Sequence, residues 1–249
     1  QLPETDEDFY QSAVGFGTFQ QLLTDFPAAK LHETIPNFHN TPDRYRALLE
    51  TLERDPMHRA AQVQPEIEFA LARQAEMSAI QNALTAGELP LRVTHNDTKI
   101  NNILFDKQGE VLCAIDLDTV MASTSLNDFG DAIRSYANTG DEDDRDLSRV
   151  GISLEMFSAY TDGYLSLRAA QLTDTEIGHL AFSARYITFE QVLRFLMDYI
   201  DGDTYYKIKY PDHNLVRTHA QYRLLQSMEE HYGEMCRIVD GIAAKYRNA

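Results

Sequence analysis

Helical periodicity covers most of the chain and fails in one short central stretch, and this contrast limits the possible folds more than any other feature. Apolar residues recur at steps of three or four, which is the spacing of one face of an α-helix. The sequence predicts helices at about residues 9–23, 41–55, 65–84, 182–200 and 222–246. We therefore expect a mostly helical protein.

The central stretch has the alternating pattern of short strands. Residues 91–95 and 103–105 are β-like, and residues 106–109 form a turn that leads into a further run at 111–116. The last two runs predict one small β-hairpin. Because no repeat or low-complexity linker interrupts the chain, we treat residues 1–249 as a single unit of the α+β class, mostly helical with an embedded hairpin.

Charge and cysteine content exclude several kinds of partner. The 39 acidic residues outnumber the 22 basic ones, and a net charge of -17 repels nucleic acid and anionic lipid. No apolar run reaches the roughly 18 residues that a membrane span needs. The two cysteines are too few for a disulfide framework, and Cys113 lies in an apolar run where a buried thiol is expected. These features favour a cytoplasmic location.

One motif carries the chemistry. Residues 95–102 read His-Asn-Asp-Thr-Lys-Ile-Asn-Asn, so that Asp97 follows His95 by two positions and precedes Asn102 by five. Asp116 comes fourteen residues after Asn102, at the exit of the predicted hairpin, which returns the chain to the same place. Phosphoryl transfer needs a carboxylate for the acceptor proton and oxygen ligands for magnesium. The spacing supplies both.

At these residues the chain resembles the kinase catalytic loop, H-x-D-x-x-x-x-N, followed by a metal-binding Asp. It is similar to the aminoglycoside phosphotransferase family, and most similar to the N-acetylhexosamine 1-kinase branch. The residues that carry this likeness are 38–41, 95–102, 115–121 and 128–134. The resemblance spans almost the whole chain and implies the C-terminal lobe of a protein-kinase-like fold.

The resemblance implies a role for each motif residue. Asp97 is the catalytic base, and Asn102 and Asp116 bind the cofactors, Mg²⁺ and ATP, with Asp118 assisting at the metal. Because a free Asp has a pKa of about 3.9, Asp97 is expected to orient the hydroxyl and take its proton late. Lys99 is placed against the transferred phosphate, and the alternative is a plain surface lysine.

The resemblance also implies acceptor residues. Asp116 and Thr119 lie against the sugar, and His39 lies at a helix end beside the catalytic loop. Arg194 is the candidate basic residue, since its helix is apolar on most sides. The alternative for Arg194 is an ion-pair ladder with the residues four positions away, Glu190 and Asp198.

Other residues near the motif admit simpler interpretations. Tyr205 either stacks on the sugar ring or packs against its neighbours. His95 is interpreted as a buried, hydrogen-bonded organiser of the loop. Asp128 and Asp131 are interpreted as capping and packing residues of a helix that begins near Asp131, and not as metal ligands.

A kinase of this family also needs an N-terminal lobe that covers the nucleotide, and the 249 residues contain no glycine-rich phosphate loop. We expect an ATP-dependent phosphotransferase with an alcohol acceptor whose isolated 249-residue chain is inactive. The expected acceptor is an N-acetylhexosamine-like sugar, phosphorylated at the anomeric hydroxyl. The alternatives are an aminoglycoside, choline or homoserine kinase, which the acidic balance would suit, and a binding module without catalysis.

Overall fold

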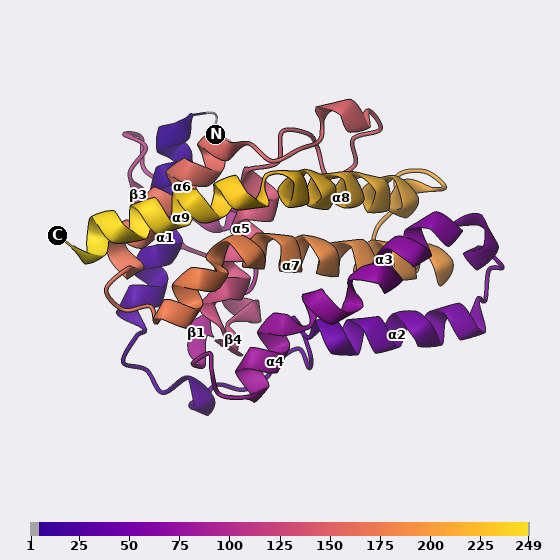
Figure 1. The fold of residues 1–249 in the computed structure, drawn as a ribbon, viewed down its shortest axis with the longest axis horizontal. Helices are drawn as coiled ribbons and strands as arrows, with labels where there is room; N and C mark the ends of the chain where they lie inside the picture. Colours follow the sequence, from indigo (N-terminus) through magenta and orange to yellow (C-terminus); the bar gives the residue numbers. More distant parts are fainter. Residues whose placement is uncertain (1–4, 249) are drawn as a thin grey trace.

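The computed structural model describes residues 5–248 and confirms a mostly helical α+β fold (Figure 1). The helices are α1 (Asp6–Leu22), α2 (Thr41–Arg54), α3 (Gln64–Met77), α4 (Ala79–Thr85), α5 (Ser125–Tyr136), α6 (Leu154–Arg168), α7 (Asp174–Ile200), α8 (His213–Glu230) and α9 (Tyr232–Arg247). Between α4 and α5 lie the strands β1 (Arg92–Thr94), β2 (Ile103–Phe105), β3 (Val111–Ala114) and β4 (Met121–Ser123).

Capping side chains explain where the helices begin. Asn40 accepts the backbone N–H of Asp43 at the start of α2, and Pro42 lies in the first turn, as predicted. Helix α7 begins eight residues before its apolar pattern becomes visible. Thr173 and Glu176 cap that end reciprocally, which satisfies backbone donors that a helix start otherwise leaves unpaired.

Two of the predicted helices are each divided into two. The helix expected over 65–84 breaks at Ser78, and the one expected over 222–246 breaks at His231 and also begins earlier. At both breaks a side chain bonds the carbonyl oxygen four residues before it. Ser78 Oγ donates at 2.8 Å, and His231 Nδ1 lies 2.9 Å from its acceptor. Such bonds compete with the helical ladder and bend helices.

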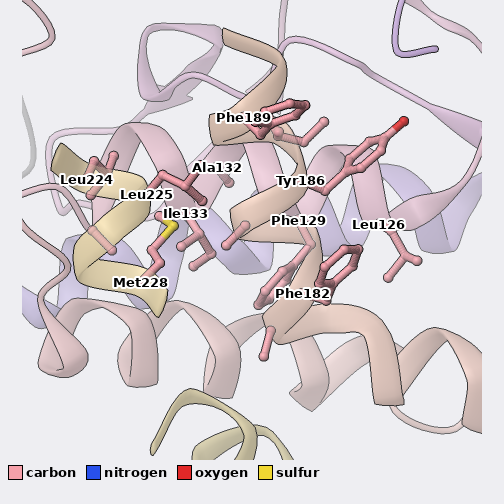
Figure 2. Close-up of a cluster of buried hydrophobic side chains, with 14 of the residues drawn as sticks. Leu126, Phe129, Ala132, Ile133, Phe182, Tyr186, Phe189, Leu224, Leu225 and Met228 are labelled. Carbon is pink, nitrogen blue, oxygen red and sulfur yellow. The ribbon is translucent and has the colours of Figure 1, made fainter. Parts of the chain in front are cut away.

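Helix α7 runs through the middle of the molecule, with α5 and α8 packed against it (Figure 1). Figure 2 shows this core, made of Leu126, Phe129, Ala132 and Ile133 from α5, Phe182, Tyr186 and Phe189 from α7, and Leu224, Leu225 and Met228 from α8. Within residues 5–248, no helix combines the length and the apolar character needed to cross a membrane.

The packing of α5 on α7 depends on Gly130. A Cβ atom there would lie 2.7 Å from the backbone carbonyl carbon of Ser183. We expect Gly130→Ala to lower the free energy of unfolding by about 1–3 kcal/mol, because the helices must move apart, as measured by urea denaturation. Gly178→Ala is the control: no atom lies within 4 Å of that position, and alanine should stabilise α7 by about 0.5–1 kcal/mol. Similar effects of the two substitutions would contradict the tight contact.

The strands form two separate antiparallel pairs. β2 pairs with β3, with Ile103 opposite Ala114, which confirms the predicted hairpin. β1 pairs with β4, a pairing that the sequence did not indicate, because three-residue strands show too little alternation. The prediction that Cys113 is buried was wrong. The hairpin packs Ile103 against Gly15 of α1, and this leaves Cys113 and its partner Leu104 exposed on the outer face.

Candidate functional site

The loop of residues 95–102 leaves β1 and is organised around His95. The His95 ring is buried and meets Phe16 edge-on at 5.3 Å between ring centroids. Its Nε2 atom lies 2.9 Å from the carbonyl oxygen of Ile115, the residue before Asp116. His95 is therefore the buried organiser that the sequence predicted, and it joins the two motif segments.

Asp97 is held by two neighbours. The Nζ atom of Lys99 lies 2.7 Å from Asp97 Oδ1, and the Nδ2 atom of Asn102 donates to Asp97 Oδ2 at 3.1 Å. Burial alone would lower the pKa of Lys99, but the Asp97 carboxylate more than offsets this and raises it. The Asp97 side chain stays 23% exposed, so its carboxylate is oriented and still open to a bound molecule.

Asn102 and Asp116 are brought together through the backbone. The Nδ2 atom of Asn102 also donates to the carbonyl oxygen of Asp97 at 2.8 Å, so its amide oxygen faces away from Asp97. The carbonyl oxygen of Asn102 accepts the N–H of Ile115 at 2.8 Å. Asp116 follows with a φ of 63°, a left-handed conformation that turns the chain sharply and leaves its side chain exposed.

This donor set fits a magnesium ion that is shared with a nucleotide. No group of three or more His, Cys, Asp or Glu side chains converges to hold a metal within residues 5–248. Mg²⁺ is usually bound by one or two carboxylates together with substrate phosphates. The carboxylate of Asp116 and the amide oxygen of Asn102 could supply the protein ligands of such a site, and the nucleotide phosphates would supply the others. Asp118 is exposed in the 3-10 turn η4 (Leu117–Thr119), where its carbonyl oxygen accepts the hydroxyl of Thr34.

Thr119 supports the loop from inside. Its side chain is buried, and its hydroxyl donates to the carbonyl oxygen of His95 at 2.7 Å. Its own carbonyl oxygen accepts the side-chain amide of Asn96 at 2.9 Å. The proton of the Thr119 hydroxyl is therefore committed to the protein.

Two aspartates of α5 hold the loop of residues 95–102, a role that the sequence did not reveal. Asp128 accepts the backbone N–H groups of His95 and Asn96 at 2.9 and 2.7 Å, and Asp131 accepts that of Thr98 at 2.9 Å. Burial raises the pKa of Asp128. It would also raise that of Asp131, but Arg134 more than offsets burial and lowers it.

The prediction that these two aspartates cap a helix beginning near Asp131 was wrong. Helix α5 begins at Ser125, and its cap is Thr124, whose hydroxyl oxygen accepts the N–H of Leu126. Both carboxylates instead point from within the helix to backbone donors more than 30 residues away. The only sequence signal for this was two acidic residues three positions apart, on one face of a helix that is otherwise buried.

His39 links α7 to the loop of residues 95–102. Its Nδ1 atom lies 3.0 Å from a carboxylate oxygen of Glu190, and its Nε2 atom lies 3.3 Å from the carbonyl oxygen of Asn96. Only a protonated imidazole can donate to both oxygens at once. Burial would lower the pKa of His39, yet Glu190 raises it overall, and His39 in turn lowers the pKa of Glu190 against the effect of burial.

The link predicts a pH-dependent stability. The stabilisation of the folded state by protonated His39 is complete below the unfolded pKa of 6.5, and it is lost as the pH rises through the higher folded pKa. The stabilisation of the folded state by ionised Glu190 is present above about pH 4.5, and it is lost as the pH falls through the lowered folded pKa of Glu190. We expect His39→Gln to lower the free energy of unfolding by about 1.5–3 kcal/mol at pH 6 and by less at pH 9, in urea denaturation. His32→Gln, on the surface, is the control, and an equal loss at both pH values would contradict the link.

Arg194 does not form the ion-pair ladder that was the alternative interpretation. Its guanidinium donates to Gln191 Oε1 at 3.3 Å and also bonds the side chain of Tyr205, and within residues 5–248 no carboxylate lies within ion-pair distance of it, although Glu190 still attracts it. Glu190 faces His39 instead. Asp198 accepts four hydrogen bonds, from the backbone N–H groups of residues 204–206 and from Asn214.

Two cavities divide the predicted acceptor residues between them. His39 and Asn96 line one cavity of about 330 Å³. Arg194 and Tyr205 line another, of about 350 Å³, in the groove between α2 and α7. The structure thus brings Asp97, Asn102 and the segment before Asp116 together, places His39 beside them, and puts Arg194 and Tyr205 in the lining of the second cavity.

The chain matches the model of the family described as the phosphotransferase enzyme family, APH, over residues 5–169. The matched residues run from α1 through the loop of residues 95–102, the hairpin and α5 to the end of α6. Arg194 and Tyr205 lie beyond them. Since the match takes in both motif segments and more than half of the chain, the protein belongs to the APH phosphotransferase family, whose members have a kinase-like fold.

Proposed function

We propose that this chain is the catalytic lobe of a kinase that transfers the γ-phosphate of ATP to a sugar hydroxyl. The observation that carries the proposal is the locked arrangement of the motif side chains. Asn102 donates to both the backbone and the carboxylate of Asp97, and its own carbonyl oxygen holds the residue before Asp116. An acceptor hydroxyl and a phosphate-bound metal would thus meet at adjacent, fixed side chains, which is how phosphoryl transfer is catalysed.

In the proposed reaction the acceptor hydroxyl oxygen attacks the γ-phosphorus, and the bond from that phosphorus to the bridging oxygen of ADP breaks. Asp97 orients the hydroxyl and takes its proton late, because an ordinary carboxylate is a weak base toward an alcohol. Lys99, already at the Asp97 carboxylate, would exchange this contact for the transferred phosphate. Bound Mg²⁺ would neutralise charge on the phosphates, held by Asn102 and Asp116, with Asp118 nearby in the chain.

The proposed acceptor is an N-acetylhexosamine-like sugar that reacts at its anomeric hydroxyl. Asp116 lies exposed beside the loop and can accept hydrogen bonds from sugar hydroxyls. Thr119 can also act toward the sugar only as an acceptor, because its hydroxyl proton is donated to the carbonyl oxygen of His95. His39, Arg194 and Tyr205 would serve the acceptor from the two cavities. The cavity at Arg194 is lined by three arginines, Arg44, Arg54 and Arg194, and by three carboxylates, Glu50, Asp198 and Asp201, and this balance of charge suits an uncharged acceptor.

The test is an acceptor panel with the complete gene product, since we also propose that residues outside this chain supply the nucleotide-covering lobe. ADP release with Mg²⁺ and ATP would be measured for N-acetylglucosamine, N-acetylgalactosamine, glucose, kanamycin, choline and homoserine. We expect kcat/KM for an N-acetylhexosamine to exceed that for every other acceptor by at least about tenfold. Preference for a cationic acceptor would overturn the sugar assignment. Failure to bind ATP in the presence of Mg²⁺ would indicate a binding module.

Removal of a proposed metal ligand should change the magnesium requirement. We expect Asp116→Asn to raise the Mg²⁺ concentration for half-maximal activity by about tenfold or more, because an amide oxygen carries no net charge. Asp106→Asn, in the hairpin turn, is the matched control and should keep the wild-type requirement. A magnesium titration of ADP release measures both, and an unchanged requirement in Asp116→Asn would remove that residue from the metal site.

A further inference from the structure

Arg134 lies buried near the end of α5 and bonds two carboxylates at once. Its Nη2 and Nε atoms donate to Asp131 Oδ1 at 2.9 and 3.2 Å, and its Nη1 atom donates to Glu142 Oε1 at 3.2 Å. Burial alone would lower the pKa of Arg134, but the two carboxylates more than offset burial and raise it. Arg134 therefore ties the segment that follows α5 to a residue in the middle of α5.

The carboxylate of Asp131 passes this contact on to the loop that carries Asp97. Its Oδ1 atom accepts from Arg134, and its Oδ2 atom accepts the backbone N–H of Thr98 at 2.9 Å. Because a carboxylate is planar, a guanidinium that holds one oxygen also orients the other. Thr98 stands between Asp97 and Lys99 in the chain. The orientation of Arg134 thus affects the backbone that places both of these side chains.

The segment that carries Glu142 is itself fixed at the next residue. Asp143 Oδ2 accepts from Lys209 Nζ at 2.9 Å and lies 2.8 Å from His213 Nε2. His213 is buried at the start of α8, and its Nδ1 atom accepts the backbone N–H of Lys209 at 3.1 Å. Since Asp143 is anchored to α8 in this way, Glu142 meets Arg134 from a defined position.

Glu142 is poorly placed to stabilise the fold. Its side chain is 46% exposed, and ion pairs open to solvent contribute little to the free energy of unfolding. Arg134 also has a counterion without it, because Asp131 is buried beside it and accepts two of its hydrogen bonds. A second carboxylate on the same planar guanidinium adds geometric restraint more than stability. Its effect is therefore expected in the position of Asp131.

Small displacements matter at this place, because phosphoryl transfer is catalysed mainly by positioning. Rotation of the Arg134 guanidinium would turn Asp131 Oδ2 away from the backbone N–H of Thr98. The peptide between Asp97 and Thr98 would then lose its acceptor, while the Thr98 hydroxyl would still donate to the carbonyl oxygen of Asp128 at 2.7 Å. The expected consequence is a shifted Asp97 in a loop that otherwise stays in place.

We propose that Glu142 and Arg134 are positioning residues of the kinase, which act through Asp131 on the backbone of Thr98 and so on the placement of Asp97. Neither residue needs to touch a substrate for this role. The segment between α5 and α6 thereby takes part in the reaction from outside the site. The proposal rests on the kinase function proposed above.

The test compares Glu142→Ala with Asp141→Ala, which removes the same charge from the preceding residue. Asp141 is exposed, and within residues 5–248 its side chain makes no hydrogen bond or ion pair with Arg134. With the complete gene product, Mg²⁺, ATP and N-acetylglucosamine, we expect Glu142→Ala to lower kcat by about three- to tenfold. The KM for ATP should change by less than about twofold, because the lost restraint affects mainly the transition state. Asp141→Ala should keep the wild-type value of both constants.

Hydrogen exchange separates the failure of this proposal from the failure of the kinase assignment. The amide of Thr98, which donates to Asp131, should exchange at least about tenfold faster in Glu142→Ala than in wild type or Asp141→Ala. Amides in the core of α7 should keep their wild-type rates. This result supports the link even if no sugar is phosphorylated. Wild-type exchange at Thr98 overturns the proposal, as does a wild-type kcat in a Glu142→Ala protein that phosphorylates N-acetylglucosamine.

Discussion

Asp97→Asn should lower the turnover number of the complete kinase by about 10²- to 10⁴-fold, the range typical of a positioned acid or base. The substitution keeps the size of the side chain, and its amide oxygen can still accept from Asn102 or Lys99, which now lie 3.1 and 2.7 Å from the two carboxylate oxygens. What it removes is the negative charge and the site that takes the acceptor proton. Folding and the loop geometry should therefore survive.

The split between kinetic constants distinguishes this role from a structural one. We expect the KM values for ATP and for the acceptor to change by less than about threefold, because the lost interaction belongs mainly to the transition state. Asp25→Asn, an exposed residue after α1, should behave as wild type in the same assay of ADP release. Turnover of Asp97→Asn close to wild type would end the assignment of Asp97 as the base.

The arrangement of the candidate site could be predicted from the sequence because it depends on short spacings. Asp97, Asn102 and Asp116 lie within twenty residues of one another, on a loop and a hairpin whose turn is easily recognised. Local geometry alone then places the residue before Asp116 against Asn102, which in turn bonds Asp97. The buried role of His95 followed for the same reason, since its partner Ile115 is at the hairpin exit.

Contacts between distant segments were not visible. The pairing of β1 with β4, the bonds from Asp128 to the loop and the pairing of Glu190 with His39 in place of Arg194 all depend on how helices and strands pack in three dimensions. An i, i+4 spacing places Arg194 and Glu190 near each other, but His39 lies in the competing position and takes the carboxylate. Spacing shows which pairs are possible, and packing decides between them.

Asp128→Ala should lower the free energy of unfolding more than either Gly130→Ala or His39→Gln. Asp128 is 1% exposed and accepts from the backbone of His95 and Asn96 and from the side chain of Gln20, all at 2.7–2.9 Å. Alanine would leave these buried donors without an acceptor, at about 1–3 kcal/mol each. We expect the free energy of unfolding, measured by urea denaturation, to fall by about 3–5 kcal/mol. Asp240→Ala, exposed on α9, should change it by less than about 0.5 kcal/mol.

Asp128→Asn separates the loop-positioning role from stability. Its amide keeps one acceptor oxygen but turns an NH₂ group toward a donor, so the loop must shift while much of the packing survives. Because a displacement of about 1 Å can cost 10²-fold in rate, we expect kcat to fall by about 10- to 100-fold at a temperature where the variant is folded. Faster amide hydrogen exchange at His95 and Asn96 than at the core of α7 would locate the change in the loop. A folded Asp128→Asn protein with wild-type kcat would show that α5 merely packs beneath the catalytic loop and does not position Asp97.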